Sequence, residues 1–241
     1  MEEALFTLLR QQTHCIGCGR TDTGVHASQY FAHIEIEELP KFDMVYRLNT
    51  LIPNDIVVHQ MIPVDDKAHA QYDAKNRQYD YFIHWDKDPF LSGFSSEYHG
   101  PSLDFRRMGA FVQYLETQKD FRSLCKQPEI YKTTICDIRS LKLYTNKEKN
   151  RLRLQINSNR FLRSMMRLIA TKMIQIGNGQ LKLDDFKSVF EQQVHEQHMV
   201  PFYPDGLYLT SVEYDYIPKI DLPIQNPYVG FAMEGWSEVE M

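Results

Sequence analysis

The chain of 241 residues is 43% hydrophobic and 24% charged, a composition that can bury a substantial core and that excludes a largely disordered protein. It has no stretch near the roughly 18 to 20 apolar residues of a membrane span, no signal-peptide features at its start, and only four cysteines, too few for a disulfide scaffold. The formal net charge of −5 argues against a polyanionic partner only if the charge is evenly spread. We therefore expect a cytoplasmic protein with no membrane contact.

The first third of the sequence predicts one helix, a glycine-rich loop and three strands. Apolar residues at helical spacing indicate an amphipathic helix over residues 1–9. Residues 16–27 contain three glycines and predict a loop. Alternation of apolar and polar residues predicts strands over 30–36 and 78–85, and a further strand is predicted over 56–61. The polar loop is thus expected between extended elements.

The rest of the chain mixes helices and strands without strict alternation. Prolines and glycines in residues 87–102 predict a linker, which divides the chain into an N-terminal half, residues 1–86, and a C-terminal half, residues 87–241. An extended tail is expected from residue 218 onward. The mixture favours an α+β fold with a largely antiparallel sheet. The helices are predicted from Asp104, from Asn159 to Gly177 and over 183–193, and the strands over 152–156 and 207–214.

The charge is distributed unevenly along the chain. Residues 120–182 contain fourteen Lys and Arg against four Asp and Glu, a local net charge of +10. The remainder of the chain is therefore strongly acidic. A basic block of this kind can hold nucleic-acid phosphates, and the alternative is a solvated basic surface with no partner.

The glycine-rich loop has the sequence Gly17-Cys18-Gly19-Arg20-Thr21-Asp22-Thr23-Gly24-Val25-His26-Ala27. Its glycines allow the backbone to turn tightly around one carboxylate and one guanidinium. Such a loop can present Asp22 into a site, although the same residues also suit an ordinary turn. The motif alone leaves both interpretations open.

The loop resembles the signature of the tRNA pseudouridine synthase A family, Gly-Arg-Thr-Asp-Ala-Gly-Val-His-Ala, and departs from it only at Thr23. Further family motifs follow in the same order along the chain and make the resemblance more specific than the loop alone. They are similar to residues 48–56 (Leu-Asn-Thr-Leu-Ile-Pro-Asn-Asp-Ile), 69–74 (His-Ala-Gln-Tyr-Asp-Ala), 77–81 (Arg-Gln-Tyr-Asp-Tyr), 159–167 (Asn-Arg-Phe-Leu-Arg-Ser-Met-Met-Arg) and 206–209 (Gly-Leu-Tyr-Leu).

The resemblance implies an RNA-modifying isomerase that converts uridine to pseudouridine in the anticodon stem-loop of tRNA. It implies two mixed sheet halves with helices packed on them and a central cleft. It also implies a homodimer, tRNA as the partner, and no cofactor or metal. A uracil inside a stem has to be flipped out before it can react, at a cost of a few kcal/mol.

The matching positions also imply roles for individual residues. Asp22 would be the essential carboxylate, acting on the ribose or on the base, and an Arg beside it would keep it ionised. Tyr79 would stack on the uracil and take the C5 proton. Arg167 would pair with Asp22, and Arg20 would hold the displaced backbone or fill the vacated stack. The remaining predicted substrate contacts are Thr21, Arg163 and Leu207.

One departure from the family pattern and two alternative interpretations complete the expectations. Family members begin with a strand and motifs that precede the first helix, and the present sequence has no counterpart of them, so we expect a chain that lacks its first strand. That absence also motivates the alternative of a catalytically impaired RNA-binding homologue. A zinc site at His14, Cys15 and Cys18 is disfavoured because no second ligand pair lies at a suitable spacing.

Overall fold

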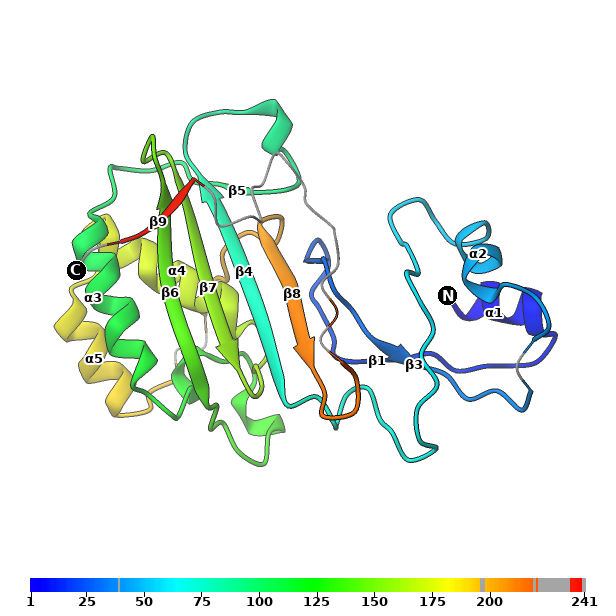
Figure 1. Ribbon diagram of the computed structural model, residues 1–241. Helices are drawn as coiled ribbons and strands as arrows, with labels where there is room; N and C mark the ends of the chain where they lie inside the picture. Colours follow the sequence, from blue (N-terminus) through cyan, green and yellow to red (C-terminus); the bar gives the residue numbers. More distant parts are fainter. Residues whose placement is uncertain (39, 196–197, 219, 221–234, 240–241) are drawn as a thin grey trace.

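The computed structural model describes residues 1–38, 40–195, 198–218, 220 and 235–239 (Figure 1). As predicted, the fold is α+β, with helices packed on a mixed sheet. The helices are α1 (Glu2–Leu9), α2 (Met44–Asn49), α3 (Phe105–Glu116), α4 (Met165–Gly177) and α5 (Leu183–Glu191). The strands are β1 (Ile16–Gly17), β2 (His26–Ala27), β3 (Ala32–His33), β4 (Asn76–His84), β5 (Ser96–Glu97), β6 (Ile138–Asn146), β7 (Arg151–Ser158), β8 (Leu207–Glu213) and β9 (Trp236–Glu238).

The large sheet has seven strands, six of them in the spatial order β2-β8-β4-β7-β6-β9, with β5 paired to β4 outside this path. The central pairings β8-β4, β4-β7 and β7-β6 are antiparallel. The short strands β2 and β5 join β8 and β4 in parallel. Strands β2 and β4 precede the predicted boundary at residue 86 and the other strands follow it, so one sheet crosses that boundary. The division into two halves stays a prediction.

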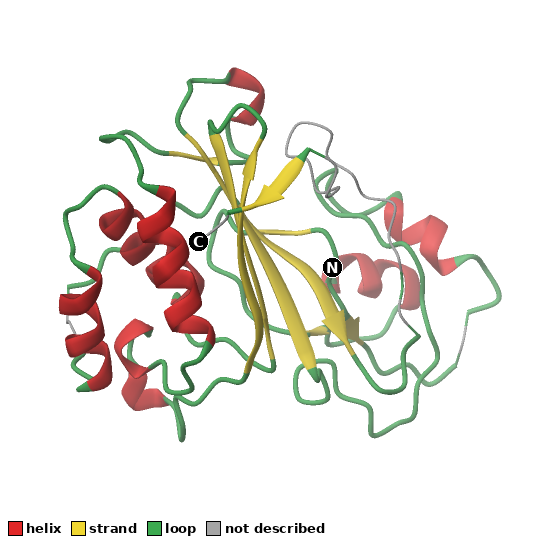
Figure 2. Ribbon diagram, turned by 60° about the vertical axis from the view of Figure 1, so that its left-hand side comes forward, coloured by secondary structure: helices red, strands yellow, loops and turns green. Residues whose placement is uncertain are grey.

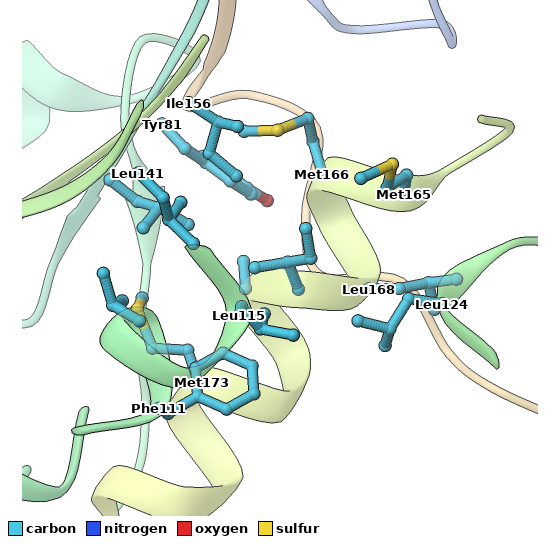
Figure 3. Packing of buried hydrophobic residues seen from close by; sticks show 14 of the residues in the cluster. Tyr81, Phe111, Leu115, Leu124, Leu141, Ile156, Met165, Met166, Leu168 and Met173 are labelled. Carbon is cyan, nitrogen blue, oxygen red and sulfur yellow. The ribbon is translucent and has the colours of Figure 1, made fainter. Parts of the chain in front are cut away.

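The main core lies between this sheet and the helices α3, α4 and α5, which cover one face of it (Figure 2). Figure 3 shows how side chains from strands and helices meet there. Tyr81 of β4 and Ile156 of β7 point toward Met166 of α4, and Phe111 of α3 packs beside Met173 of α4. All five side chains are buried. Burial of apolar area of this kind is the dominant stabilising term in folding.

Helix α3 shows why the sequence specified an element correctly. Asp104 precedes it with an extended backbone, and its carboxylate accepts hydrogen bonds from the backbone N–H groups of Arg106 and Arg107. This cap satisfies donors that the first helical turn leaves unpaired. Met108 and Phe111, one turn apart, then place their side chains on the buried face. The helix therefore begins where the sequence predicts it.

The opposite face of the sheet contains a buried polar network. The Asp80 carboxylate, on β4, pairs with the Arg153 guanidinium of β7 at 2.7 Å and accepts hydrogen bonds from the side chains of Gln155 and Thr210. Both ionic side chains are at most 5% exposed. A buried charge is tolerated only when it is paired and hydrogen-bonded in this way. The network therefore fixes the relation of β4, β7 and β8.

The N-terminal helices form a small separate core. Ala4 and Leu5 of α1 pack with Met44 and Leu48 of α2 and with Ile52. The predicted helix over residues 1–9 is confirmed as α1. Helix α2, which the sequence did not predict, begins after Asp43, whose carboxylate accepts a hydrogen bond from the backbone of Tyr46. Both helices lie on the far side of the sheet from α3, α4 and α5 (Figure 2).

Most of the other predicted elements are confirmed. The strands over 78–85, 152–156 and 207–214 are β4, β7 and β8, and the helix over 183–193 is α5. The predicted linker, residues 87–102, contains the single 3₁₀ turn Pro89–Leu91 and strand β5. Among the described residues, no helix has the length and apolar character needed to cross a bilayer.

Three expectations differ from the structure. Residues 56–61 are not a strand, the strand over 30–36 shortens to β3, and the helix from Asn159 begins only at Met165. Strand β6 was not predicted. Most of the expected tail lies outside the described residues, but residues 236–238 form β9 and pair with β6.

Candidate active site

The loop that carries Asp22 is held at both of its ends. On its N-terminal side, the backbone N–H of Cys18 donates to Phe31 at 2.8 Å, and the hydroxyl of Tyr30 donates to the carbonyl of Gly19 at 2.6 Å. A Cβ at Gly17 would lie 2.0 Å from the Tyr30 hydroxyl. A side chain at residue 17 would therefore displace the Tyr30 ring, and with it the hydrogen bond to Gly19.

On its C-terminal side, the loop enters the large sheet. The N–H of Val25 donates to the carbonyl of Asp22 at 3.1 Å, and Gly24 closes the turn with a left-handed backbone, φ 83°. Strand β2 then begins at His26, whose ring stacks on Tyr208 of β8 with centroids 4.7 Å apart. The loop is therefore fixed to a central strand of the fold within four residues of Asp22.

Asp22 and Arg167 meet as the sequence predicted, although they lie on separate elements. The Asp22 Oδ2 atom is 2.7 Å from Nη1 of Arg167, in the first turn of α4. The two side chains are 37% and 17% exposed. The pair is therefore partly desolvated and still open to a reactant.

Two further contacts orient this ion pair. The Nε of Arg167 donates to the carbonyl of Phe202 at 2.6 Å, which leaves Nη1 directed at the carboxylate. The hydroxyl of Ser164 lies 3.4 Å from the same Asp22 oxygen. Ser164 directly precedes α4 and has a left-handed backbone, with φ 58°. The N-terminal end of a helix favours an anion. The Asp22 carboxylate therefore faces a guanidinium, a hydroxyl and the end of a helix.

Sequence reasoning missed Ser164 and Phe202. Ser164 lies inside the motif at residues 159–167 and three residues before Arg167, so helical spacing could have drawn attention to it. Phe202 contributes only its backbone carbonyl. No side-chain pattern can reveal such a contact.

Tyr79 lies on the helix-facing side of β4, where it is half-buried. Its ring meets Phe161 edge-on, with centroids 4.8 Å apart. Burial raises the pKa of the Tyr79 phenol, Cys18 adds to the rise, Arg77 opposes it, and Asp22 contributes a smaller increase. The phenol is therefore protonated at neutral pH and offers an aromatic face and an O–H donor.

The predicted substrate contacts occupy different environments. Arg20 and Thr21 are exposed, and no hydrogen bond or ion pair joins either of them to the described residues. Arg163 is exposed beside the start of α4, where its guanidinium donates to the side chain of Gln127. Leu207 is only 5% exposed and packs in the main core. Leu207 is thus not brought to the surface with the others.

The basic block is less uniform than its sequence suggested. Within the described part of the chain, ion pairs with carboxylates are formed by Arg139, Lys142, Arg151, Arg153 and Arg167.

A second group lies beside the start of α4. The backbone N–H of Lys126 donates to the carbonyl of Arg163 at 3.0 Å, and the guanidinium of Arg160 lies 5.6 Å from the ring centre of Tyr131. In the described part of the chain, no carboxylate is within ion-pair distance of Lys126, Arg160 or Arg163. These three cations are therefore available to an anionic partner next to Asp22 and Arg167.

The predicted absence of a metal site remains a prediction. Among the described residues, no group of three or more His, Cys, Asp or Glu is arranged to hold a metal ion. His14 lies 3.5 Å from Glu2, and the thiol of Cys18 is buried.

Comparison with known proteins identifies the class to which this fold and site belong. A family model described as tRNA pseudouridine synthase matches residues 111–215, which include β6, β7, α4 and Arg167. Arg167 thus lies within the matched region, and Asp22 lies before it. The chain is a pseudouridine synthase, an isomerase that acts on uridine in tRNA.

Relatives over most of the chain define the family more closely. The tRNA pseudouridine synthase A of Bacteroides fragilis is 38% identical over 88% of this chain and 84% of its own length. The enzyme of the same name from Porphyromonas gingivalis is 35% identical over 89% and 86%, and that from Chlorobium phaeobacteroides is 33% identical over 89% and 82%. The chain belongs to the tRNA pseudouridine synthase A family.

Proposed function

We propose that this chain isomerises uridine in the anticodon stem-loop of tRNA without a cofactor, and that Asp22 is its catalytic carboxylate. The observation that carries the proposal is the 2.7 Å ion pair between Asp22 and Arg167. The guanidinium fixes the position of the carboxylate through a charge-assisted hydrogen bond. Its remaining exposure leaves room for a flipped nucleotide.

The reaction needs no other reactant. The bond between ribose C1′ and uracil N1 breaks, the base turns, and a bond from C1′ to C5 forms. N1 gains a proton and C5 loses one, so the atoms balance. The Asp22 carboxylate serves as the nucleophile whether it attacks the ribose or the base, and in both routes Arg167 holds it in position for the attack.

The other site residues are assigned to binding the substrate. Tyr79 stacks on the uracil, and stacking on an aromatic ring contributes about 1 to 3 kcal/mol per base. The raised pKa of its phenol favours this role over that of a phenolate base for the C5 proton. Exposed Arg20 and Thr21 contact the flipped nucleotide or fill the space that it leaves in the stack.

The tRNA backbone is assigned to the cations beside α4. Lys126, Arg160 and Arg163 lie next to the site and have no carboxylate partner in the described part of the chain, so they can bind phosphates directly. We extend the proposal to a cytoplasmic homodimer. Sedimentation velocity of the purified protein tests the dimer, and fluorescence of a tagged chain in cells tests the location.

The test of Asp22 is its replacement by Asn, which keeps the shape of the side chain and removes its charge. Turnover is measured by release of tritium from tRNA labelled at uridine C5, and RNA affinity by filter binding. We expect Asp22→Asn to abolish release while the dissociation constant changes by less than about threefold, because the carboxylate acts on the reacting atoms. The matched control is Asp66→Asn, at an exposed carboxylate away from the site.

Three outcomes separate the candidate functions. Loss of tritium release in Asp22→Asn alone supports the proposal. Undiminished release in that variant removes Asp22 from the chemistry. No release from the parent protein, with tight RNA binding retained, supports the alternative of an impaired RNA-binding homologue.

A further inference from the structure

Arg77, at the start of β4, makes contacts that no role described above uses. Its Nη2 donates to the carbonyl of Cys18 at 2.7 Å and to the carbonyl of Gln71 at 2.8 Å. Its Nη1 lies 3.4 Å from the carbonyl of Asn159. One guanidinium therefore connects three backbone segments that are far apart in the sequence.

Two of these segments lead to the site. Cys18 lies four residues before Asp22, and Asn159 opens the stretch that runs into α4. Arg77 itself lies two residues before Tyr79, on the same side of β4. The three groups assigned to chemistry and stacking thus come from elements that meet at Arg77.

The bonding of Arg77 suits a brace better than an RNA contact. In the described part of the chain, no carboxylate is within ion-pair distance of it, and its donors are directed at backbone carbonyls of the protein. A guanidinium presents several donors in a rigid planar fork, whereas an ammonium is a compact point charge on a flexible stem. A lysine at this position would keep the charge and lose the simultaneous bonds.

We propose that Arg77 is a positioning residue of the active site, which sets the Asp22 loop and the start of α4 relative to Tyr79 and does not contact the RNA phosphates. The proposal rests on the proposed role of Asp22. It predicts that disturbing Arg77 slows the reaction of bound RNA and leaves binding unchanged. A misplacement of about 1 Å at a reacting group costs on the order of 100-fold in rate.

The experiment compares Arg77→Lys and Arg77→Gln with the parent protein. Three quantities are measured: the single-turnover rate at saturating tRNA, the dissociation constant as a function of salt, and the midpoint of thermal unfolding. The matched control is Arg107→Lys, an exposed arginine that pairs with Asp104 on α3, outside the site. We expect both Arg77 variants to lose about 10- to 100-fold in the single-turnover rate, with the dissociation constant within about threefold and the salt dependence unchanged.

Two results would overturn the proposal. A phosphate contact would instead weaken binding in Arg77→Gln, lower the slope of log affinity against log salt by about one, and leave the saturated rate intact. If Arg77 only stabilised the fold, its variants would have a lower midpoint of thermal unfolding. Their single-turnover rate per folded molecule would then equal that of the parent protein, with the folded molecules counted from the stoichiometry of RNA binding. Arg77→Lys keeps the charge and is the safer variant for this comparison.

Asp22→Asn in the same assay distinguishes the two proposals. If that variant is inactive and Arg77→Lys retains the full saturated rate, the positioning role fails and the function of Asp22 stands. If Asp22→Asn turns over normally, the proposed function fails, whatever Arg77 does.

Discussion

Replacement of Arg167 by Lys tests the geometry of the candidate site most directly. The guanidinium donates from Nη1 to Asp22 at 2.7 Å and from Nε to the carbonyl of Phe202 at 2.6 Å. A lysine ammonium retains the positive charge but does not reproduce two donors in a fixed plane. One of the two contacts is therefore lost or lengthened, although the charge beside Asp22 remains.

The size of the effect follows from the bond that is lost. A hydrogen bond to a charged group contributes about 1.5 to 3 kcal/mol. Each 1.36 kcal/mol is tenfold in rate, so kcat/KM for tritium release should fall by about 10- to 150-fold. We expect the loss in kcat more than in KM, because Arg167 supports the carboxylate and the RNA backbone is assigned to other cations.

Arg106→Lys, on the exposed surface of α3, is the matched control and should retain parental kcat/KM. A value within twofold of the parent for Arg167→Lys would refute the reasoning, since the oriented guanidinium would then be unnecessary. A loss confined to KM and matched by a weaker dissociation constant would instead place Arg167 in RNA binding.

Two further predictions concern stability. A Cβ at Gly206 would lie 2.0 Å from the backbone oxygen of Phe82, so Gly206→Ala should lower the free energy of unfolding, measured by urea titration, by about 3 kcal/mol. The control is Gly19→Ala, where no atom lies nearer than 4.0 Å to the added Cβ and the free energy should change little. Equal effects of the two substitutions would contradict the packing at Gly206. Burial raises the pKa of Tyr79 and Tyr81 above the ordinary 10.0. The contribution of these neutral phenols to the free energy of unfolding is therefore complete below pH 10 and is lost as the pH rises beyond it. The urea midpoint should therefore fall from pH 9 to pH 11, together with the appearance of phenolate absorbance, and a flat midpoint would count against buried phenols.

The sequence predicted β4 and β7, in which alternation is uninterrupted, and β6 shows one reason why a strand was missed. The pairing of β6 with β7 shifts register between Ile138 and Ser140. As a result, buried Ile138 and Leu141 are three residues apart, whereas Leu141 and Leu143 are two apart. An extra residue in one strand reverses the alternation of faces, and the simple period-two pattern is lost.

Residues 56–61 show the opposite error. They were predicted as a strand, but the side chain of Asn49 exchanges two hydrogen bonds with the backbone of Val58, at 2.7 and 2.8 Å. A side chain thus satisfies backbone groups that a neighbouring strand would otherwise bond. A run of residues that suits a strand does not reveal whether a partner strand is present.

The site was predictable as far as family motifs reach. The Asp22 and Arg167 pairing was implied by the resemblance, and the structure brings the two side chains together. The delayed start of α4 was not predictable, because the left-handed backbone of Ser164 interrupts an otherwise helical pattern. That interruption leaves Phe161 free to meet Tyr79. Local strain of this kind is set by tertiary contacts rather than by residue preference.

The sequence separation of the Asp22–Arg167 ion pair has a consequence for how the enzyme folds. Asp22 and Arg167 are 145 positions apart, so the pair cannot form until β2 has docked on β8 and α4 has packed on the sheet. Contacts between distant parts of a chain carry a closure cost before they return any stabilisation, and they tend to form late. During refolding, far-ultraviolet circular dichroism should therefore recover before tritium release does, and regained activity would report completion of the native topology.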